Sequence, residues 1–99
     1  MAEDPLKIFE KLDPDLLKLV DNTKGLALND GALPRRIKLL IAMALDASKE
    51  AVEGVKSLAD QALKAGATKE EIMETLRVAD YISGVGCVYT AARAFKDMF

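Results

Sequence analysis

The chain has 99 residues, a length that predicts one domain spanning residues 1–99. Its composition is 51% hydrophobic but only 5% aromatic, which favours aliphatic packing between helices over a β-sheet. The net charge is −2 and the basic residues are scattered, so there is no basic stripe and we expect no nucleic-acid partner.

The longest apolar run and the cysteine content both bear on localisation. Leu39–Leu45 is far shorter than the ~20 residues needed to cross a bilayer, so no membrane partner is expected. The N-terminus lacks the basic and apolar regions of a signal peptide, and a single Cys fits a reducing compartment. The sequence therefore predicts a soluble cytoplasmic protein.

Two Asp-Pro pairs predict the first helices. An Asp N-cap accepts hydrogen bonds from free backbone N–H groups, and Pro at the first helical position has no N–H to leave unsatisfied. Asp4-Pro5 starts a helix at about 5–11, and Asp13-Pro14 starts a second at about 14–24, ending near Gly25. A turn is expected at Asn29-Asp30-Gly31. The apolar side of the second helix consists of Leu16, Leu17, Val20 and Leu26.

The next two helices form the centre of the predicted fold. Leu33-Pro34 starts a helix at about 34–46 that is apolar on nearly every side, so we expect the other segments to wrap it completely. An amphipathic helix follows at about 49–65, capped by Asp46 or Ser48, and Gly66 suits the left-handed position beyond its end. Its expected inner residues are Ala51, Val52, Val55, Leu58, Ala59, Ala62 and Leu63.

The last third of the chain predicts two more helices. Thr68 and Glu71 form a capping box that opens a helix at about 69–83, and the glycines of Ser83-Gly84-Val85-Gly86 separate it from a last helix at about 87–97. The expected inward residues are Ile72, Leu76, Ala79 and Ser83, flanked by Met73, Tyr81 and Ile82, and then Val88, Ala91, Ala92 and Phe95. The sequence thus predicts an all-α bundle of five or six helices.

Few residues offer catalytic chemistry. The chain has no His and one Cys, and its carboxylates alternate with lysines, so we expect no metal site and no cofactor. Glu50 and Glu53, flanked by Lys49 and Lys56, predict a solvated, salt-bridged helix face. Without His, a Ser or Cys nucleophile has no evident base.

Cys87 is the one residue that suggests a reactive group. It follows Gly86 at a predicted helix N-terminus, where the helix dipole favours a thiolate. The alternative, which we favour, is a small buried apolar residue in a closely packed region. Asp80 and Arg93 are expected nearby, where an ion pair between them would be structural. The candidate catalytic residues are therefore Cys87, Arg93, Asp80 and Tyr89.

Three segments in a fixed order resemble one protein family. LPRRIKLLIAMALDA is followed by ALKAGATKEEIMETL and then by YISGVGCVYTAARAF. Together they resemble the carboxymuconolactone decarboxylase family, which includes alkylhydroperoxidase (AhpD)-like proteins, over about Leu16–Phe95. The A-G-A-T-K-E-E-I junction is the most specific piece. The resemblance implies an all-α, AhpD-like bundle that forms homo-oligomers, such as trimers or hexamers.

The resemblance also implies where catalytic residues would lie. The redox branch of the family carries a Cys-x-x-Cys-x-x-x-His run before the junction and a Glu one helix earlier, and the decarboxylase branch is similar in the place of its His. Counted back from Gly66, these positions are Ala51 and Gly54 for the cysteines, Leu58 for the His and Leu39 for the Glu. No family catalytic residue is therefore carried over, and we expect apolar side chains to fill the pocket.

Two hypotheses about function follow. The first, which we favour, is a family member without the redox motif or the decarboxylase His. It would be a non-redox oligomeric binding or assembly module, with a small apolar ligand between subunits as a further expectation. The second is an enzyme with a family-like decarboxylase or peroxidase-related activity at a relocated site around Cys87.

Overall fold

The computed structural model describes residues 4–99, and every regular element in this range is helical. The elements are the 3-10 helix η1 (Pro5–Ile8) and the α-helices α1 (Phe9–Leu12), α2 (Pro14–Leu28), α3 (Arg35–Ser48), α4 (Val52–Lys64), α5 (Lys69–Ser83) and α6 (Gly86–Phe95). The predicted all-α class is confirmed. None of these helices has both the length and the apolar content that a membrane span requires.

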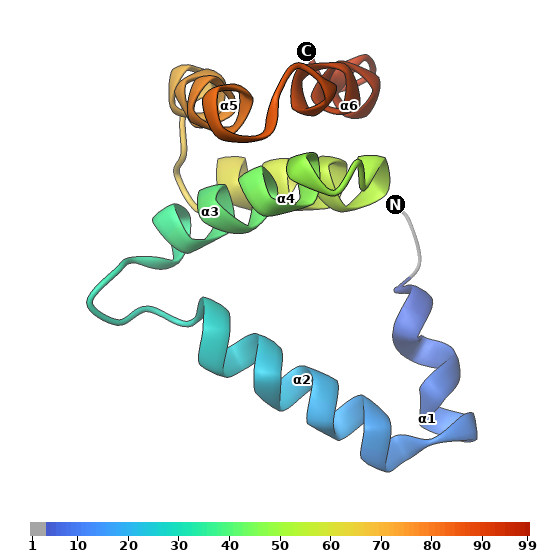
Figure 1. Ribbon diagram of the computed structural model, residues 1–99. Helices are drawn as coiled ribbons and strands as arrows, with labels where there is room; N and C mark the ends of the chain where they lie inside the picture. Colours follow the sequence, from blue (N-terminus) through green and yellow to red (C-terminus); the bar gives the residue numbers. More distant parts are fainter. Residues whose placement is uncertain (1–3) are drawn as a thin grey trace.

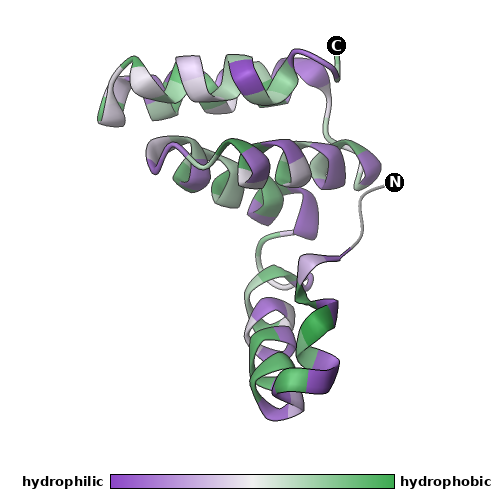
Figure 2. Ribbon diagram, turned by 90° about the vertical axis from the view of Figure 1, so that its right-hand side faces the viewer, coloured by the Kyte–Doolittle hydropathy of each residue, from purple (hydrophilic) through white to green (hydrophobic). Residues whose placement is uncertain are grey.

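The helices divide into two parts that differ in packing (Figure 1). α3 packs against α4, α5 and α6, and α6 in turn packs against α4 and α5. We call α3–α6 the body. η1, α1 and α2 form a hairpin that leads away from the body, and we call residues 5–28 the arm. Figure 2 shows apolar residues along the helices of the arm.

The hydrophobic core lies within the body. No residue of η1, α1 or α2 is buried, and Leu28, the last residue of α2, packs against the edge of the core. The buried core residues are Leu39, Leu40, Met43, Ala47, Val55, Ala59, Ala62, Ala67, Ile72, Leu76, Ala79, Cys87, Ala91, Ala94 and Phe95. Small residues dominate this set, and they let the four body helices approach closely.

Both predicted Asp N-caps are confirmed in the arm. Leu6 N–H donates to Asp4 Oδ1 and Leu16 N–H donates to Asp13 Oδ1, each at 3.0 Å. The second helix, however, continues to Leu28 instead of ending near Gly25. Gly25 does not adopt the positive φ of a helix-ending glycine, so the helix runs through it at a propensity cost of ~1 kcal/mol.

Hydrogen bonds fix the turn between the arm and the body. Arg35 N–H donates to Asp30 Oδ1 at 2.6 Å, and Lys38 Nζ donates to Asn29 O at 2.7 Å. The predicted turn is therefore confirmed. Because both bonds join the turn to the first residues of α3, they set the direction in which the arm leaves the body.

The expectation that the central helix is buried on all sides is wrong. α3 buries Leu39 and Met43 completely, whereas Ile41 and Leu45 are 46% and 58% exposed. The reason is that α4, α5 and α6 cover one side of α3, and the arm leads away instead of covering the other. One apolar side of α3 has no partner within the described chain.

α4 confirms the predicted amphipathic pattern but not the predicted cap. Val55, Ala59 and Ala62 are buried, as expected. The N-cap is Ala51, with no capping side chain, so neither Asp46 nor Ser48 fills that role. The reason is that Asp46 and Ser48 still belong to the last turn of α3, where Ser48 Oγ donates back to Leu45 O at 2.6 Å.

The junction between α4 and α5 follows the sequence prediction closely. Gly66 has φ +102°, its N–H donates to Leu63 O, and Ala67 N–H donates to Ala62 O, which is a complete Schellman motif. The capping box is also present. Thr68 Oγ1 accepts from Glu71 N–H at 3.0 Å, and Glu71 Oε1 accepts from Thr68 N–H at 2.9 Å.

Two arginines tie the start of α3 to this junction. Arg36 Nη1 lies 2.5 Å from Glu71 Oε2, and Arg35 Nη2 donates to Gln61 Oε1 at 3.3 Å. The Thr68 backbone N–H lowers the pKa of Glu71 below its ordinary value, burial opposes this, and Arg36 adds to the lowering. The adjacent arginines are therefore structural groups that clamp α3, α4 and α5 together.

The inward sides of α5 and α6 differ in part from the prediction. Ile72, Leu76 and Ala79 are buried as expected, but Ser83, Tyr81 and Ile82 are exposed. On α6, Ala91 and Phe95 are buried, whereas Val88 and Ala92 are exposed. Their places are taken by Cys87, Thr90 and Ala94. The buried positions 87, 90, 91, 94 and 95 recur at helical spacing, so the inward side of α6 is turned away from Val88 and Ala92.

Candidate functional site

The start of α4 holds the two positions where the family resemblance would place cysteines. Ala51 is the N-cap of α4, and Gly54 lies in its first turn. A side-chain carbon at position 54 would overlap the carboxylate of Asp46. This carboxylate therefore occupies the space that a side chain at position 54 would need. Here the structure differs from the expectation that only apolar side chains fill this region.

The other two resemblance positions are apolar and lie in or beside the core. Leu39 is fully buried on α3, and Leu58 on α4 is half-buried and packs against the core. Neither these residues nor Ala51 line any of the surface hollows described below. None of these three hollows therefore opens at the positions where the resemblance would place catalytic residues.

Glu50 lies in the turn between α3 and α4 and approaches the N-terminus of α6. It has φ +59°, in the left-handed region that residues with side chains seldom adopt. Its Oε1 is 3.5 Å from the place where a Cβ on Gly86 would lie. Glu50 and Glu53 are both exposed, as expected, but Glu50 precedes α4 instead of lying on its face. Neither Glu50 nor Glu53 forms an ion pair among the described residues.

Cys87 lies in the first turn of α6 with its thiol inside the core. It is 2% exposed, and its Sγ donates to Ala79 O on α5 at 3.6 Å. A dissolved substrate cannot reach this sulfur without local opening of α6. The position agrees with the small buried residue that the sequence favoured.

The other three candidate catalytic residues lie on the surface. Asp80, Tyr89 and Arg93 are all exposed, Tyr89 by 61%. No ion pair joins Asp80 to Arg93 in the described range, and none of the three forms a hydrogen bond with Cys87. Asp80 instead helps line a hollow of about 500 Å³ between α5 and α6, together with Met73, Leu76, Arg77, Val85 and Val88. The structure does not assemble these candidates into one site.

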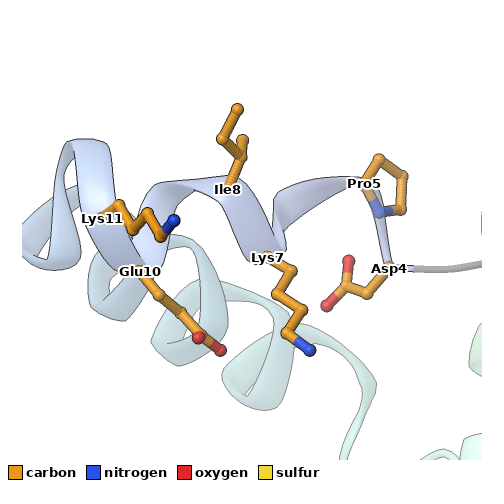
Figure 3. A pocket seen from close by; sticks show the side chains of 6 residues that line it. All are labelled: Asp4, Pro5, Lys7, Ile8, Glu10 and Lys11. Atoms are coloured by element: carbon orange, nitrogen blue, oxygen red, sulfur yellow. The ribbon is translucent and has the colours of Figure 1, made fainter.

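Residues 4–99 contain no group of three or more His, Cys, Asp or Glu side chains placed to hold a metal ion. A second hollow, of about 350 Å³, lies on the arm (Figure 3). Its lining side chains, among them Asp4, Lys7 and Ile8, point in different directions from η1 and α1. Such an arrangement offers no convergent set of groups for chemistry.

A further hollow, with an almost wholly apolar lining, is a groove between α3 and α5. It has a volume of about 390 Å³, and we call it the α3/α5 groove. No charged side chain lines it, and its lining residues are Ile37, Leu40, Ile41, Ala44, Leu45, Thr75 and Val78. Sequence reasoning missed this groove because it assumed that α3 is wrapped on every side. The sequence signal that could have indicated this groove is the run of apolar residues in α3.

Comparisons with known proteins address the identity of this fold. The model of the carboxymuconolactone decarboxylase family matches residues 14–97. The structure is similar to the crystal structure of apo-lpg0406, a carboxymuconolactone decarboxylase family protein from Legionella pneumophila, with a TM-score of 0.86 and 35% sequence identity. That similarity covers 92% of this chain and 81% of the Legionella chain. The search of curated proteins gave no match.

These findings agree with the segments from which the resemblance was drawn. The Schellman motif at Gly66, the capping box at Thr68 and the Arg36–Glu71 pair all lie in the matched range. The chain therefore belongs to the carboxymuconolactone decarboxylase family.

Proposed function

We propose that this protein is a homo-oligomeric, non-redox member of its family that serves as a binding or assembly module in the cytoplasm. One observation carries the proposal: the arm exposes an apolar side along its whole length and buries no residue of its own. Isolated helices as short as α2 are only marginally stable in water, so such a side needs a partner surface.

The residues also argue against the family's known chemistries in this chain. The redox mechanism requires two thiols that form an intrachain disulfide, and the chain has one Cys. The decarboxylase branch uses a His, and the chain has none. A relocated site around Cys87 would require a thiol that reaches solvent, whereas this one is 2% exposed.

Sedimentation velocity over a wide range of protein concentrations tests the assembly. We expect a discrete oligomer, a trimer or a hexamer, with a dissociation at low concentration. A monodisperse monomer at all concentrations would overturn the proposal.

A second assay tests the absence of the family chemistries. Peroxide reduction with a dithiol reductant and decarboxylation of carboxymuconolactone should both stay at the level of buffer, with a family member that carries both cysteines as the positive control. Turnover that Cys87→Ser removes would instead favour the relocated enzyme site.

A further inference from the structure

We propose that the arm of one copy lies in the α3/α5 groove of a second copy, so that each chain both inserts an arm and receives one. This inference rests on the proposed homo-oligomer and adds which two surfaces meet.

The apolar side of α2 forms a continuous stripe without a charged residue. Positions 16, 19, 20, 23, 26 and 27 fall within about 120° of the helix circumference at 100° per residue. We call this set the arm stripe: Leu16, Leu19, Val20, Thr23, Leu26 and Ala27. Leu19 and Leu26 are 62% and 86% exposed. The Thr23 hydroxyl donates a hydrogen bond to Leu19 O at 3.0 Å, so it needs no other partner. Every residue of the stripe stays exposed within the described chain, Val20 the least at 36%.

The groove matches the arm stripe in character. Its lining runs from Ile37 to Leu45 on α3, about 12 Å, so it can take about two turns of α2, which has 15 residues. The groove side chains Ile41, Leu45 and Val78 are 46%, 58% and 65% exposed. A helix laid along this groove would bury apolar side chains on three helices at once.

No residue of the arm lines the groove of its own chain, and hydrogen bonds hold the connecting turn in this arrangement. The turn bonds Arg35 N–H to Asp30 Oδ1 and Lys38 Nζ to Asn29 O, and the arm leads away from the body (Figure 1). The radius of gyration is 14.2 Å, against about 13 Å for a compact domain of this length. The occupant of the groove must therefore come from another molecule.

The exposed area is what an exchange of arms requires. The chain exposes 7023 Å². A monomeric protein of 10.7 kDa exposes about 5,500 Å², so the excess is about 1,500 Å². A standard interface buries about 800 Å² on each partner. The excess thus corresponds to about two such patches on each chain, one for its arm and one for its groove. A second copy carries both surfaces in equal number, which an unrelated partner or a small apolar ligand would not supply.

Complementation between two variants tests this assignment. In the arm variant, Leu19→Asp and Val20→Asp place charges on the stripe. In the groove variant, Ile41→Asp and Leu45→Asp place them on the receiving surface. All four residues are at least 36% exposed, so the body can keep its fold, which far-UV circular dichroism checks. The control, Lys18→Glu with Asp21→Lys, changes charges on the opposite side of α2 and should sediment as the unmodified protein does.

We expect each variant alone to be monomeric, with association weakened at least 100-fold. An equimolar mixture should contain heterodimers, because the intact arm of the groove variant fits the intact groove of the arm variant.

A groove variant that assembles normally, or a mixture that stays monomeric, would overturn the arm exchange while leaving the proposed homo-oligomer intact. Native mass spectra that show a small molecule bound in the groove of the oligomer would also overturn it. A monomeric unmodified protein would overturn both proposals.

Lysine cross-linking of the unmodified protein tests the same pairing of arm and groove without substitutions. In oligomers formed from ¹⁴N- and ¹⁵N-labelled copies, mixed-isotope links should join Lys18 or Lys24 of the arm to Lys49 or Lys69, at the ends of α3 and α5. Mixed-isotope links between the Lys18 residues of two copies, without links to the body, would show that arms pair with arms and would overturn the proposal.

Discussion

The body and the arm are both helical and both amphipathic, yet only in the body does the chain itself bury the apolar sides of its helices. In the body, each helix has an apolar side that meets another helix, and Leu39, Val55 and Ile72 are fully buried. In the arm, Leu19 and Leu26 have the same local pattern and remain exposed. An apolar stripe therefore predicts that a surface is buried, but it does not predict which molecule buries it.

The largest expected contrast is between one leucine in each part. Leu39→Ala removes a fully buried side chain and should lower the free energy of unfolding by about 3 kcal/mol at every protein concentration. Leu26→Ala, at 86% exposed, should change the stability of the dissociated chain by less than about 0.5 kcal/mol. Urea unfolding followed by circular dichroism at low and high concentration measures both. If Leu26→Ala costs as much as Leu39→Ala at the lowest concentration, the arm is part of the chain's own core and the comparison fails.

Cys87 gives the next contrast, between neighbouring positions on α6. The buried thiol should react with a thiol reagent on the order of 100-fold more slowly in the native protein than after unfolding, because reaction requires local opening. A matched control is Cys87→Ala combined with Val88→Cys, which moves the thiol to a position that is 42% exposed. The control should react nearly as fast folded as unfolded. A native Cys87 that reacts at the control's rate would favour the relocated enzyme site.

A smaller effect is expected at the start of α4, where Gly54 lies against the Asp46 carboxylate. Gly→Ala within a helix ordinarily stabilises a protein by about 0.5–1 kcal/mol. At Gly54 the added carbon meets the Asp46 carboxylate, so the gain should be lost or reversed. In an Asp46→Ala background the gain should return, giving a coupling of about 1 kcal/mol in a double-mutant cycle. The same gain in both backgrounds would mean that Asp46 does not hold this space.

These contrasts also show what the sequence could and could not predict. Local signals were predicted correctly, because the Asp13 cap, the Thr68 capping box and the Gly66 motif depend on residues a few positions apart. The burial of α3 was predicted wrongly, because it depends on where the arm points. That direction is set by bonds in the turn, such as Lys38 Nζ to Asn29 O, which no periodicity reveals.

The candidate site was predicted less well than the fold for a related reason. The Asp46 carboxylate over Gly54 and the approach of Glu50 to the N-terminus of α6 depend on the shape of the turn between α3 and α4. The left-handed φ of Glu50 in that turn has no signal in the sequence, because this region usually holds Gly or Asn. Burial of Cys87 was predictable, since a lone Cys among small residues is usually a core residue.

The smallest expected effect is a pH dependence that belongs to the body alone. The bond from Thr68 N–H and then the Arg36 guanidinium hold the pKa of Glu71 below its ordinary value. In the window between the folded and unfolded pKa values, the unfolded chain binds more protons, so stability rises with pH there. The Glu71 contribution to stability is therefore fully present above the unfolded-state pKa of about 4.3 and is lost as the pH falls through the lower folded-state pKa.

Urea midpoints measured from pH 7 down to pH 3 should decline less steeply for Glu71→Gln than for the unmodified protein. Glu10→Gln in the arm is the control, since no hydrogen bond or ion pair to the Glu10 carboxylate occurs among the described residues, and it should leave the acid limb unchanged. An acid limb that is equally steep for Glu71→Gln would mean that the clamp between α3 and α5 is not electrostatic.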